Sequence, residues 1–212
     1  MGSVKLIHST PNGEELIAYM ARVSNPNNQS NPSYDRLIQY LIKHKHWSPF
    51  EMVNLCMEIE TTRSVAAQIL RHRSFSFQEF SQRYSTVTDL PEVPDFRRQD
   101  VTNRQNSYDG IDETTKEEFR IRTKFLFESC RALYKEMLSA GVAKECARDI
   151  LPMATPTKLY MNGTLRSWLH YCDLRCGNGT QKEHKDIADQ CKAVIADKFP
   201  SVFNAMWSYG SL

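Results

Sequence analysis

The chain has 212 residues, a length that suits one domain built on a single hydrophobic core. Its 27 basic and 25 acidic residues give a formal net charge of only +2, which argues against a nucleic-acid-coating protein. The apolar runs are too short to span a bilayer and no signal peptide is visible, so we expect a soluble cytoplasmic protein without a membrane partner. Six cysteines without a CxxC pair fit reduced thiols. We predict one domain over residues 1–212.

The first sixty residues alternate short strands with amphipathic helices. Residues 4–7 predict a strand, and residues 13–23 predict a helix whose buried face carries Leu16, Tyr19, Met20 and Val23. A loop over 25–32 leads to a second helix over 33–44, which buries Tyr34, Leu41 and either Leu37 or Ile38. Residues 52–60 alternate as a strand, with inward side chains Val53, Ile59 and either Leu55 or Cys56.

The second half of the chain is mainly helical. Residues 86–112 are polar and lack a periodic pattern, so we expect a disordered surface excursion or, alternatively, a substrate lid. A long helix follows, with a capping box of Thr115 and Glu118 and an end at Gly141. Its apolar stripe consists of Phe119, Leu126, Cys130, Leu133 and Met137. This stripe predicts either packing in the hydrophobic core or a helix contact between subunits. Two closing helices are expected over 165–174 and 180–199, the second with a Thr180–Glu183 capping box and buried Ile187, Cys191 and Val194.

The stretch from 64 to 85 breaks both the helix and the strand period, and such breaks tend to fall at functional sites. A small apolar helix precedes Arg71, His72 and Arg73, and Gln68 lies one turn before Arg71 on the same face. Arginine presents a planar fork that matches phosphate oxygens or an imide edge. If residues 79–83 are extended, one side presents an acceptor, a small donor and a cation, namely Glu79, Ser81 and Arg83. A solvated basic turn is the alternative.

Three further groups of polar residues stand out in the sequence. His44, His46 and His72 are candidate metal ligands, but no carboxylate or cysteine stands at ligand spacing beside them, so we expect no metal site. Arg166 and His170 are four residues apart and share a helical face. Glu145 and Arg148 are three apart and could form an ion pair on a short helix.

Arg71-His72-Arg73, seven intervening residues and Ser81 resemble the signature of the flavin-dependent thymidylate synthases. The match continues through the residues around Ser81: Glu79, Arg83, Tyr84 and Ser85. His46, Ser48, Pro49, Phe50 and Glu51 are similar to the HxSPFE segment of the same family. Three positions depart from the family's pattern, because Met52 and Gly179 replace common histidines and Thr164 replaces a common asparagine.

The resemblance implies an α+β fold with a central, mostly antiparallel sheet flanked by long helices. It also implies a homotetramer with active sites at subunit interfaces. The implied reaction methylates dUMP to dTMP, with methylenetetrahydrofolate as the carbon donor and NADPH-reduced FAD as the hydride source. In such an enzyme the cofactor supplies the electron chemistry while the protein positions and polarises the substrate.

The resemblance also implies roles for individual residues. Those assigned to the flavin are His46, Ser48, Arg71, His72, Arg73, Glu79, Thr164, Arg166 and His170. Those assigned to the nucleotide are Gln68, Arg71, Glu79, Ser81, Gln82, Arg83, Arg148 and Arg175. Arg175 is the catalytic candidate, because a fixed guanidinium would stabilise the charge that develops on the uracil. No base is evident for Ser81, so we expect neither a serine nor a cysteine nucleophile.

Two alternatives belong to other functional classes. The basic and aromatic run from 71 to 84 could form a single-strand or RNA-binding groove, although the glutamates near it and the near-neutral charge oppose this. A flavoprotein of the same fold acting on another pyrimidine nucleotide is the second alternative.

Overall fold

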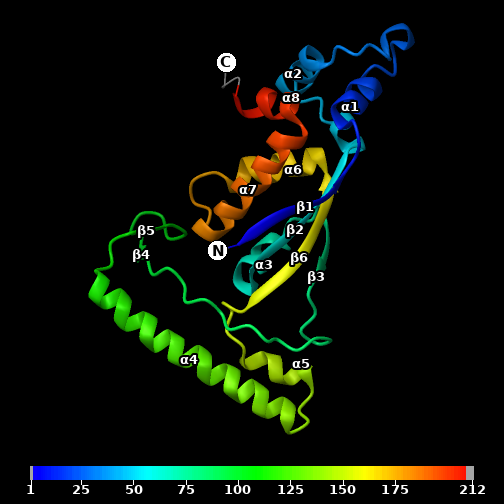
Figure 1. The fold of residues 1–212 in the computed structure, drawn as a ribbon. Coiled ribbons are helices and arrows are strands. Elements are labelled where there is room, and N and C mark those ends of the chain that lie inside the picture. The colour runs from blue at the N-terminus through cyan, green and yellow to red at the C-terminus, as the bar shows by residue number, and fades with distance from the viewer. Residues whose placement is uncertain (1, 209–212) are drawn as a thin grey trace.

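The computed structural model describes residues 2–208, so residue 1 and residues 209–212 of the predicted domain lie outside the described residues. Its centre is a four-stranded sheet with the strand order β1-β2-β6-β3, in which every neighbouring pair is antiparallel (Figure 1). The strands are β1 (Ser3–Ser9), β2 (Asn54–Thr62), β3 (Ser76–Glu79) and β6 (Pro156–Thr164). Helices flank the sheet, which confirms the predicted α+β class with an antiparallel sheet.

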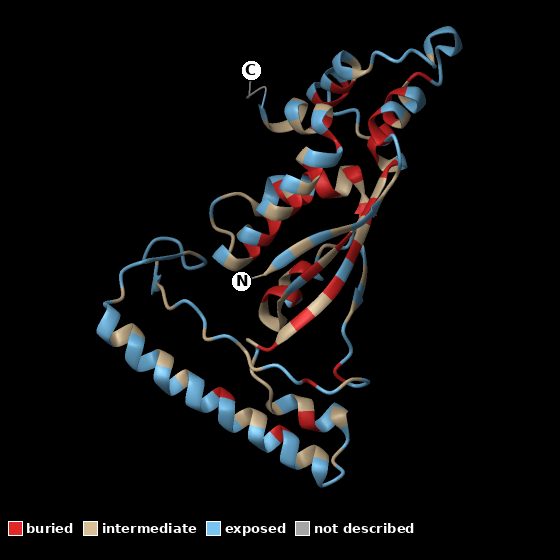
Figure 2. Ribbon diagram, viewed as in Figure 1, coloured by how far each residue is buried: buried red, intermediate tan, exposed pale blue. Residues whose placement is uncertain are grey.

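The core lies between one face of this sheet and three helices: α3 (Arg63–Ile69), α6 (Leu165–Arg175) and α7 (Lys182–Lys198). Met57 of β2 lies opposite Met161 of β6, and Ile59 lies opposite Leu159. All four side chains are fully buried, as the red bands of Figure 2 show along both strands. Trp168 of α6 is fully buried in the same core and donates its Nε1 hydrogen to the carbonyl of Leu55 at 3.1 Å. Burying a large apolar side chain contributes about 1.5–3 kcal/mol, so this layer dominates the stability.

Strand β6 is absent from our sequence-based prediction, although it is central to the sheet. The alternation of Thr157, Leu159 and Met161 with polar residues was the available signal, since these three side chains are buried and their neighbours are not. In β2 the buried position is Leu55 and not Cys56, which resolves the alternative left open by the sequence.

The N-terminal helices pack at one end of the sheet. They are α1 (Gly13–Ala21) and α2 (Asp35–Lys43), with single turns at η1 (Pro26–Asn28) and η2 (Ser48–Met52). The predicted buried face of α1 is wrong, because Tyr19, Met20 and Val23 are exposed. A Cβ on Gly13 would lie 2.6 Å from the ring of Phe199, so this glycine sets the buried face, which continues at Ile17. In α2 the buried residues are Ile38, Leu41 and Ile42.

The longest helix, α4 (Glu113–Ser139), stands away from the sheet and is mostly exposed (Figures 1 and 2). Of the predicted apolar stripe, Phe119, Leu126 and Leu133 are exposed, so the stripe is not core of this chain. The helix begins one turn earlier than predicted, because the side chain of Asp112 accepts the backbone N–H of Thr115 at 2.9 Å. A second small core of Val87, Tyr134 and Ala147 ties α4 to α5 (Lys144–Ala147) and to η3 (Arg148–Ile150).

Residues 86–112 are not a segment without structure, as the sequence suggested. They contain a short hairpin of β4 (Arg98–Gln99) and β5 (Ser107–Tyr108), which lies beside the start of α7 (Figure 1). Helix α7 begins after Gln181 and has no side-chain cap, so the predicted Thr180–Glu183 capping box is also wrong. Beyond it, α8 (Pro200–Phe203) and η4 (Asn204–Ser208) close the described chain. No helix among residues 2–208 is long and apolar enough to cross a membrane.

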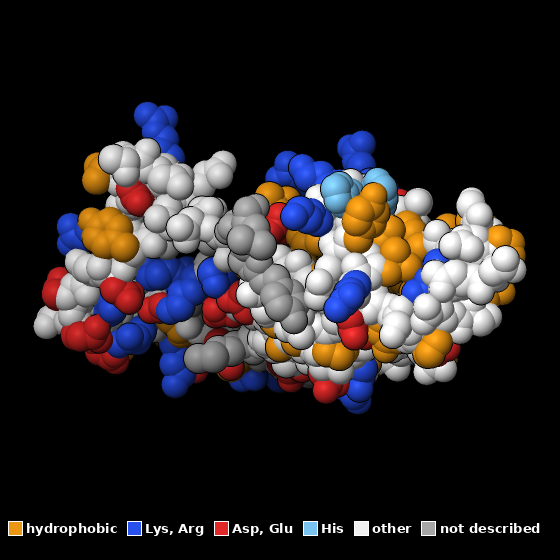
Figure 3. Space-filling view, turned by 90° about the horizontal axis from the view of Figure 1, so that it is seen from above, with side chains coloured by type: hydrophobic (Ala, Val, Ile, Leu, Met, Phe, Trp, Pro, Cys, Tyr) orange, Lys and Arg blue, Asp and Glu red, His pale blue; other side chains and the backbone are white. Residues whose placement is uncertain are grey.

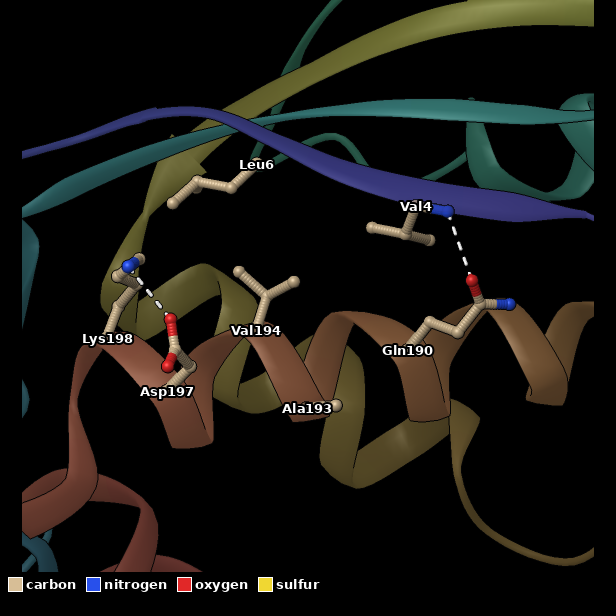
Figure 4. A pocket seen from close by; sticks show the side chains of 7 residues that line it. All are labelled: Val4, Leu6, Gln190, Ala193, Val194, Asp197 and Lys198. Atoms are coloured by element: carbon tan, nitrogen blue, oxygen red, sulfur yellow. Dashed lines mark hydrogen bonds and ion pairs between the residues drawn. The ribbon is translucent and has the colours of Figure 1, made fainter.

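The outer edge of β1 meets α7 across a shallow groove of about 380 Å³, lined mainly by Val4, Leu6, Val194 and Gln190 (Figure 4). There the carboxamide of Gln190 forms backbone hydrogen bonds of the kind that a neighbouring strand would form. Its Oε1 accepts the backbone N–H of Val4 at 3.1 Å, and its Nε2 donates to the carbonyl of Gly2 at 3.1 Å. These two hydrogen bonds give partners to backbone groups at the start of the edge strand and join the strand to α7.

We expect the substitution Gln190→Ala to lower the free energy of unfolding by about 1–3 kcal/mol, because it leaves both backbone groups without a protein partner. Urea unfolding monitored by circular dichroism measures the change. Gln39→Ala on α2 is the matched control, since Gln39 is exposed and makes no side-chain hydrogen bond to the described residues. Equal stabilities of the two variants would contradict the assigned role of Gln190.

Candidate active site

The arginine turn, Arg71 to Arg73, follows directly on α3. The side chain of Thr62 caps this helix by accepting the N–H of Val65 at 3.4 Å, and Val65, Ala66 and Ile69 bury its inner face as predicted. The turn itself closes through the N–H of Phe75, which donates to the carbonyl of His72 at 3.3 Å. Within residues 2–208, neither Arg71 nor Arg73 has an ion-pair partner, and both are exposed.

Phe75 fixes the turn to the sheet. Its ring lies over Gly163 of β6, where an added Cβ would come within 2.4 Å of the ring. The same ring packs edge-on against Trp168, with centroids 4.9 Å apart. The glycine is therefore required by this close approach.

The structure brings the catalytic candidate Arg175 to the arginine turn. The Nε of Arg175 donates to Nε2 of His72 at 2.9 Å, and the His72 ring packs edge-on against Tyr171 at 5.0 Å between centroids. Burial, together with the positive charge of Arg175, lowers the pKa of His72. The imidazole is therefore held neutral and accepts the hydrogen bond that orients the guanidinium.

A pocket of about 330 Å³ opens at the start of α6, the end opposite to Arg175. The predicted flavin residues Thr164, Arg166 and His170 line it, together with Glu51, Ser74 and Ser167. The guanidinium of Arg166 pairs with the carboxylate of Glu51. Thr164 caps α6 by accepting the N–H of Ser167 at 3.2 Å. Ser74 and Ser167 were missed from the sequence, since single serines carry no distinguishing pattern.

His170 is packed edge-on by Trp47, with ring centroids 4.9 Å apart. Burial and the charge of Arg166 lower the pKa of His170, so it too is held neutral. The other predicted flavin residues on this side, His46 and Ser48, do not line the pocket. His46 instead lies in a surface cluster with His44 and Tyr40, and Figure 3 shows histidine side chains next to hydrophobic ones on this face. Among the described residues no group of three or more histidine, cysteine or acidic side chains could hold a metal ion.

Residues 79–83 are not extended, so the predicted alternation of Glu79, Ser81 and Arg83 on one side is wrong. Strand β3 ends at Glu79, and the carbonyl of Ser81 accepts the N–H groups of Tyr84 and Ser85 in a turn. The N–H of Phe80 still donates to the carbonyl of Lys158 at 2.9 Å, and the chain leaves β6 after it. Glu79 stays beside β6, where its Oε1 accepts from Arg63 at 2.6 Å and from Thr157 at 3.0 Å.

The turn over residues 81–84 meets the segment after α4. Arg83 pairs with Glu145 at 3.0 Å, and Lys144 donates to the carbonyl of Tyr84 at 2.7 Å. Arg148 therefore does not pair with Glu145, as its spacing suggested, and its nearest carboxylate is Asp149 at 3.9 Å. Gln82 is buried, and its Nε2 has no hydrogen-bond partner within residues 2–208.

The predicted residues thus form two groups. Gln68, His72 and Arg175 lie where α3, α6 and α7 meet, while Ser81 to Arg83 lie against the 144–150 segment. No hydrogen bond or ion pair of the described residues joins the two groups directly.

A set of polar residues missed by sequence reasoning surrounds Gln68. Its Nε2 donates to Oε1 of Gln181 at 2.6 Å, and its Oε1 lies 3.3 Å from Nδ1 of His184. The Nε2 of this fully buried histidine lies 3.1 Å from the hydroxyl of Tyr171. Burial, with the nearby charges of Arg175 and His72, lowers the pKa of His184 to about 4. Residues 180–184 have the spacing of an ordinary helix start at the surface, so the sequence does not reveal the hydrogen bonds of Gln181 and His184 to Gln68.

The family model described as thymidylate synthase complementing protein matches residues 5–201 of the chain. The chain belongs to this family, that of the flavin-dependent thymidylate synthases. It is therefore an enzyme of this family, and the resemblance carried by the arginine turn is confirmed.

Relatives named as flavin-dependent thymidylate synthases align along most of the chain. The Synechocystis sp. enzyme is 54% identical over 193 residues, which cover 91% of this chain and 89% of that protein. A probable flavin-dependent thymidylate synthase of Paramecium bursaria Chlorella virus 1 is 48% identical over 202 residues, or 95% and 94% of the two chains.

Solved structures with the same fold include the UMP/dUMP methylase PolB from Streptomyces cacaoi. The crystal structure bound with 5-Br dUMP has a TM-score of 0.87 and 26% identity, and the alignment covers 99% of this chain and 96% of that one. The structure bound with 5-Br UMP aligns equally well, over 99% and 95% of the chains.

The lowered pKa of His184 predicts a pH-dependent stability. The unfolded chain protonates this residue near pH 6.5, whereas the folded protein resists protonation until about pH 4. Stability is therefore fully present above pH 6.5 and falls as the pH drops towards 4. We expect the variant His184→Gln to lose stability less steeply over this window in urea unfolding measurements. His72 and His170 act in the same direction, so part of the slope remains, and unchanged slopes in the two proteins would disprove the assignment.

Proposed function

We propose that this chain is a flavin-dependent thymidylate synthase that methylates dUMP to dTMP. Methylenetetrahydrofolate is the proposed carbon donor and NADPH-reduced FAD the proposed source of hydride. The names of the relatives and the dUMP methylase structures support the reaction. The observation that carries the proposal is the contact of Arg175, at the end of α6, with His72 of the arginine turn.

The residues of the pocket suit a flavin. They offer a guanidinium, a neutral imidazole and serine and threonine hydroxyls, and the exposed Arg71 and Arg73 add two cations without carboxylate partners. Arginine forks bind phosphate oxygens in this way. When bound, the FAD would supply the reducing equivalents of the reaction. A pocket of about 330 Å³ is at the lower end for ligand sites and holds only part of a dinucleotide, so a neighbouring copy would complete it.

Arg175 is the proposed catalytic residue. Its Nε is occupied by the neutral His72, which leaves the other four N–H donors of the guanidinium for the uracil. A fork held in this way needs no reorganisation when negative charge develops on the pyrimidine ring, and fixed donors of this kind act strongly on rate. Burial of His72 serves this role, because a protonated imidazole could not accept from Arg175.

The nucleotide phosphate is assigned to the second group of residues. Arg83, Arg148 and the 81–84 turn supply cations and N–H donors there, and the unpartnered Nε2 of Gln82 is a further donor. The exposed Arg83–Glu145 pair is worth little on its own, so a phosphate dianion would compete with it. Charge-assisted hydrogen bonds to the phosphate contribute roughly 1.5–3 kcal/mol each. The free Oε2 of Glu79 would accept a hydrogen bond from the nucleotide or the flavin.

No covalent step through cysteine or serine is part of the proposal. The hydroxyl of Ser81 has no basic partner among the described residues, and a serine needs one to act as a nucleophile. The hydrogen bond with Cys176, together with burial, raises the pKa of Cys172, and burial raises the pKa of Cys191, so both thiols stay protonated.

A homotetramer with shared active sites is the proposed assembly, and the chain is proposed to act in it as one domain. The support is the set of exposed apolar side chains along α4, which are Phe119, Ile121, Phe125, Leu126 and Leu133. An apolar surface of this kind on an otherwise well-packed protein marks an interaction site. The incomplete flavin pocket points the same way.

The spectrum and turnover of the purified protein test the proposed function. We expect flavin absorbance that shifts on addition of dUMP, and formation of dTMP with methylenetetrahydrofolate and NADPH. The substitution Arg175→Ala should lower kcat by roughly 100- to 1000-fold while the flavin remains bound. Arg36→Ala, an exposed arginine of α2, is the control. Colourless protein that binds oligonucleotides, or methylation of UMP but not dUMP, would refute the proposed reaction.

Sedimentation velocity tests the assembly. We expect the wild-type protein to sediment as a tetramer and the variant Phe125→Glu to sediment as smaller species, because the substitution replaces an exposed aromatic side chain of α4 with a charge. Lys124→Glu adds the same carboxylate to an exposed neighbouring position and should leave the tetramer intact. A fully active wild-type monomer would refute shared active sites.

A further inference from the structure

The 86–112 segment is connected to Gln68 by a continuous chain of hydrogen bonds. Arg97, in front of β4, holds the carboxylate of Glu183 with both terminal nitrogens, at 2.7 and 3.1 Å. Gln181 donates its Nε2 hydrogen to the same carboxylate at 2.8 Å. Gln68 in turn donates to Gln181 at 2.6 Å. His184 and Tyr171 then continue the chain into α6.

Arg97 is unusually enclosed for a residue of a surface hairpin. Only 12% of its side chain is exposed, against 38% for Glu183. Ser107 of β5 accepts from its Nε at 3.0 Å, and Asp95 accepts from its Nη1 at 3.2 Å. Lys182 binds Asp95 at 3.1 Å, which adds a second connection between the hairpin segment and α7. Acceptors on Glu183, Asp95 and Ser107 therefore bind all three nitrogens of the guanidinium.

The charges of Arg97 and Glu183 set the direction of every hydrogen bond in this series. A guanidinium only donates and an ionised carboxylate only accepts. Burial raises the pKa of Glu183, but the hydrogen bonds from Arg97 and Gln181 outweigh this and lower it overall, so Glu183 is ionised. Gln181 must turn its NH₂ group to Glu183, which directs its carbonyl oxygen to Gln68. Gln68 must then turn its own NH₂ group to Gln181, which directs its oxygen to His184.

The same logic fixes the proton on His184. Because Oε1 of Gln68 accepts, Nδ1 of His184 carries the hydrogen. The imidazole is neutral, so its Nε2 accepts from the hydroxyl of Tyr171. Reversing any one amide would place two acceptors or two donors face to face inside the protein, where an unmade hydrogen bond is costly.

We propose that Arg97 is a positioning residue that, through Glu183 and Gln181, locks the carboxamide of Gln68 in one orientation and thereby makes the site select uracil over cytosine. The proposal rests on the proposed function, in which Arg175 contacts the uracil, and we take Gln68 to contact the same base because it lies with His72 and Arg175 where α3, α6 and α7 meet. It gives the hairpin segment a role in substrate choice that depends on charge and not on covering the site.

The selection follows from the hydrogen-bonding pattern of the two bases. After its contacts with Gln181 and His184, Gln68 keeps one N–H donor and one oxygen lone pair. Uracil presents a carbonyl oxygen and an N–H at the edge where cytosine presents an amino group and a bare ring nitrogen. A carboxamide that can rotate by half a turn pairs with either edge. A locked one pairs with uracil and leaves polar groups unpaired against cytosine, and sites built in this way reject the wrong ligand strongly.

Nucleotide titrations of the flavin-loaded enzyme test the proposal. The affinities for dUMP and for deoxycytidine monophosphate are measured from the change in flavin absorbance, and their ratio is the readout. Glu183→Gln keeps the size of the side chain but removes its fixed acceptor character. We expect this variant to lower the ratio by about 3- to 10-fold, the worth of one hydrogen bond, by binding dUMP less well and the cytosine nucleotide better. Arg97→Gln should do the same, and it serves if Glu183→Gln fails to fold.

Two matched variants separate selection from simple tethering. Lys182→Gln removes the ion pair with Asp95, and with it the second connection between the hairpin segment and α7, without altering the hydrogen bonds of Arg97 to Glu183. Arg98→Gln removes the neighbouring arginine, whose Nε donates to the carbonyl of Gly110. Both should keep the wild-type ratio of affinities. An unchanged ratio in Glu183→Gln and Arg97→Gln, or an equal fall in the Lys182→Gln variant, would overturn the proposal.

Nitrogen NMR of histidine tests the direction of the chain without nucleotide, so it is independent of the proposed function. The signals of His184 are assigned by their absence from the His184→Gln variant. We expect a neutral ring with its hydrogen on Nδ1 in the wild type and a mixture of both neutral forms in Glu183→Gln. A hydrogen on Nε2 in the wild type would overturn the proposal, whereas failure of the wild type to bind dUMP would refute the proposed function instead.

Discussion

The position of the arginine turn depends on the missing side chain at Gly163. Phe75 fills that space, with its ring edge-on to Trp168, and its backbone N–H closes the turn at His72. Trp168 is held in place by its hydrogen bond to the carbonyl of Leu55, which lies opposite Gly163 in the neighbouring strand β2. Turn, sheet and helix α6 are thus joined through one close packing contact. A Cβ at position 163 would push Phe75 away and separate His72 from Arg175.

The two departures from the family's pattern on this side of the molecule have local explanations. The hydroxyl of Thr164 caps α6 and so begins the helix that carries Arg166, His170 and Arg175. Gly179 has a φ of +91°, a left-handed conformation that strains any residue with a Cβ. The loop that turns at this glycine delivers Gln181 to Gln68 and places His184 against Tyr171.

Sequence reasoning predicted those parts of the fold and site that depend on local pattern. Spacing and period predict that Arg166 and His170 lie together, and they also predict the strand β2 and the helices α2, α3, α6 and α7. Strand β6 and the buried face of α1 do not, because Gly163 and Gly13 act through close contacts with Phe75 and Phe199 from distant parts of the chain. The end of β3 at Glu79 was missed for a related reason, since the turn that follows is set by backbone hydrogen bonds. The role of residues 181–184 depends on Arg97, about 85 positions earlier, and no periodicity reports such a pairing.

The arginines around the site fall into two kinds. Arg63, Arg97 and Arg166 each hold a carboxylate, on Glu79, Glu183 and Glu51, and in doing so they fix the positions of neighbouring elements. Arg71, Arg73 and Arg175 have no carboxylate partner within residues 2–208, and Arg175 is oriented only by a neutral imidazole.

A solvent-accessible guanidinium without a carboxylate partner is hydrated and keeps its N–H donors available to an anionic ligand. A pyrimidine monophosphate and the pyrophosphate of a dinucleotide both offer such an anion. The near-zero net charge of the chain therefore includes carboxylates that hold neighbouring elements, together with three guanidinium groups that have no carboxylate partner among the described residues, and we propose that these three groups meet the ligands.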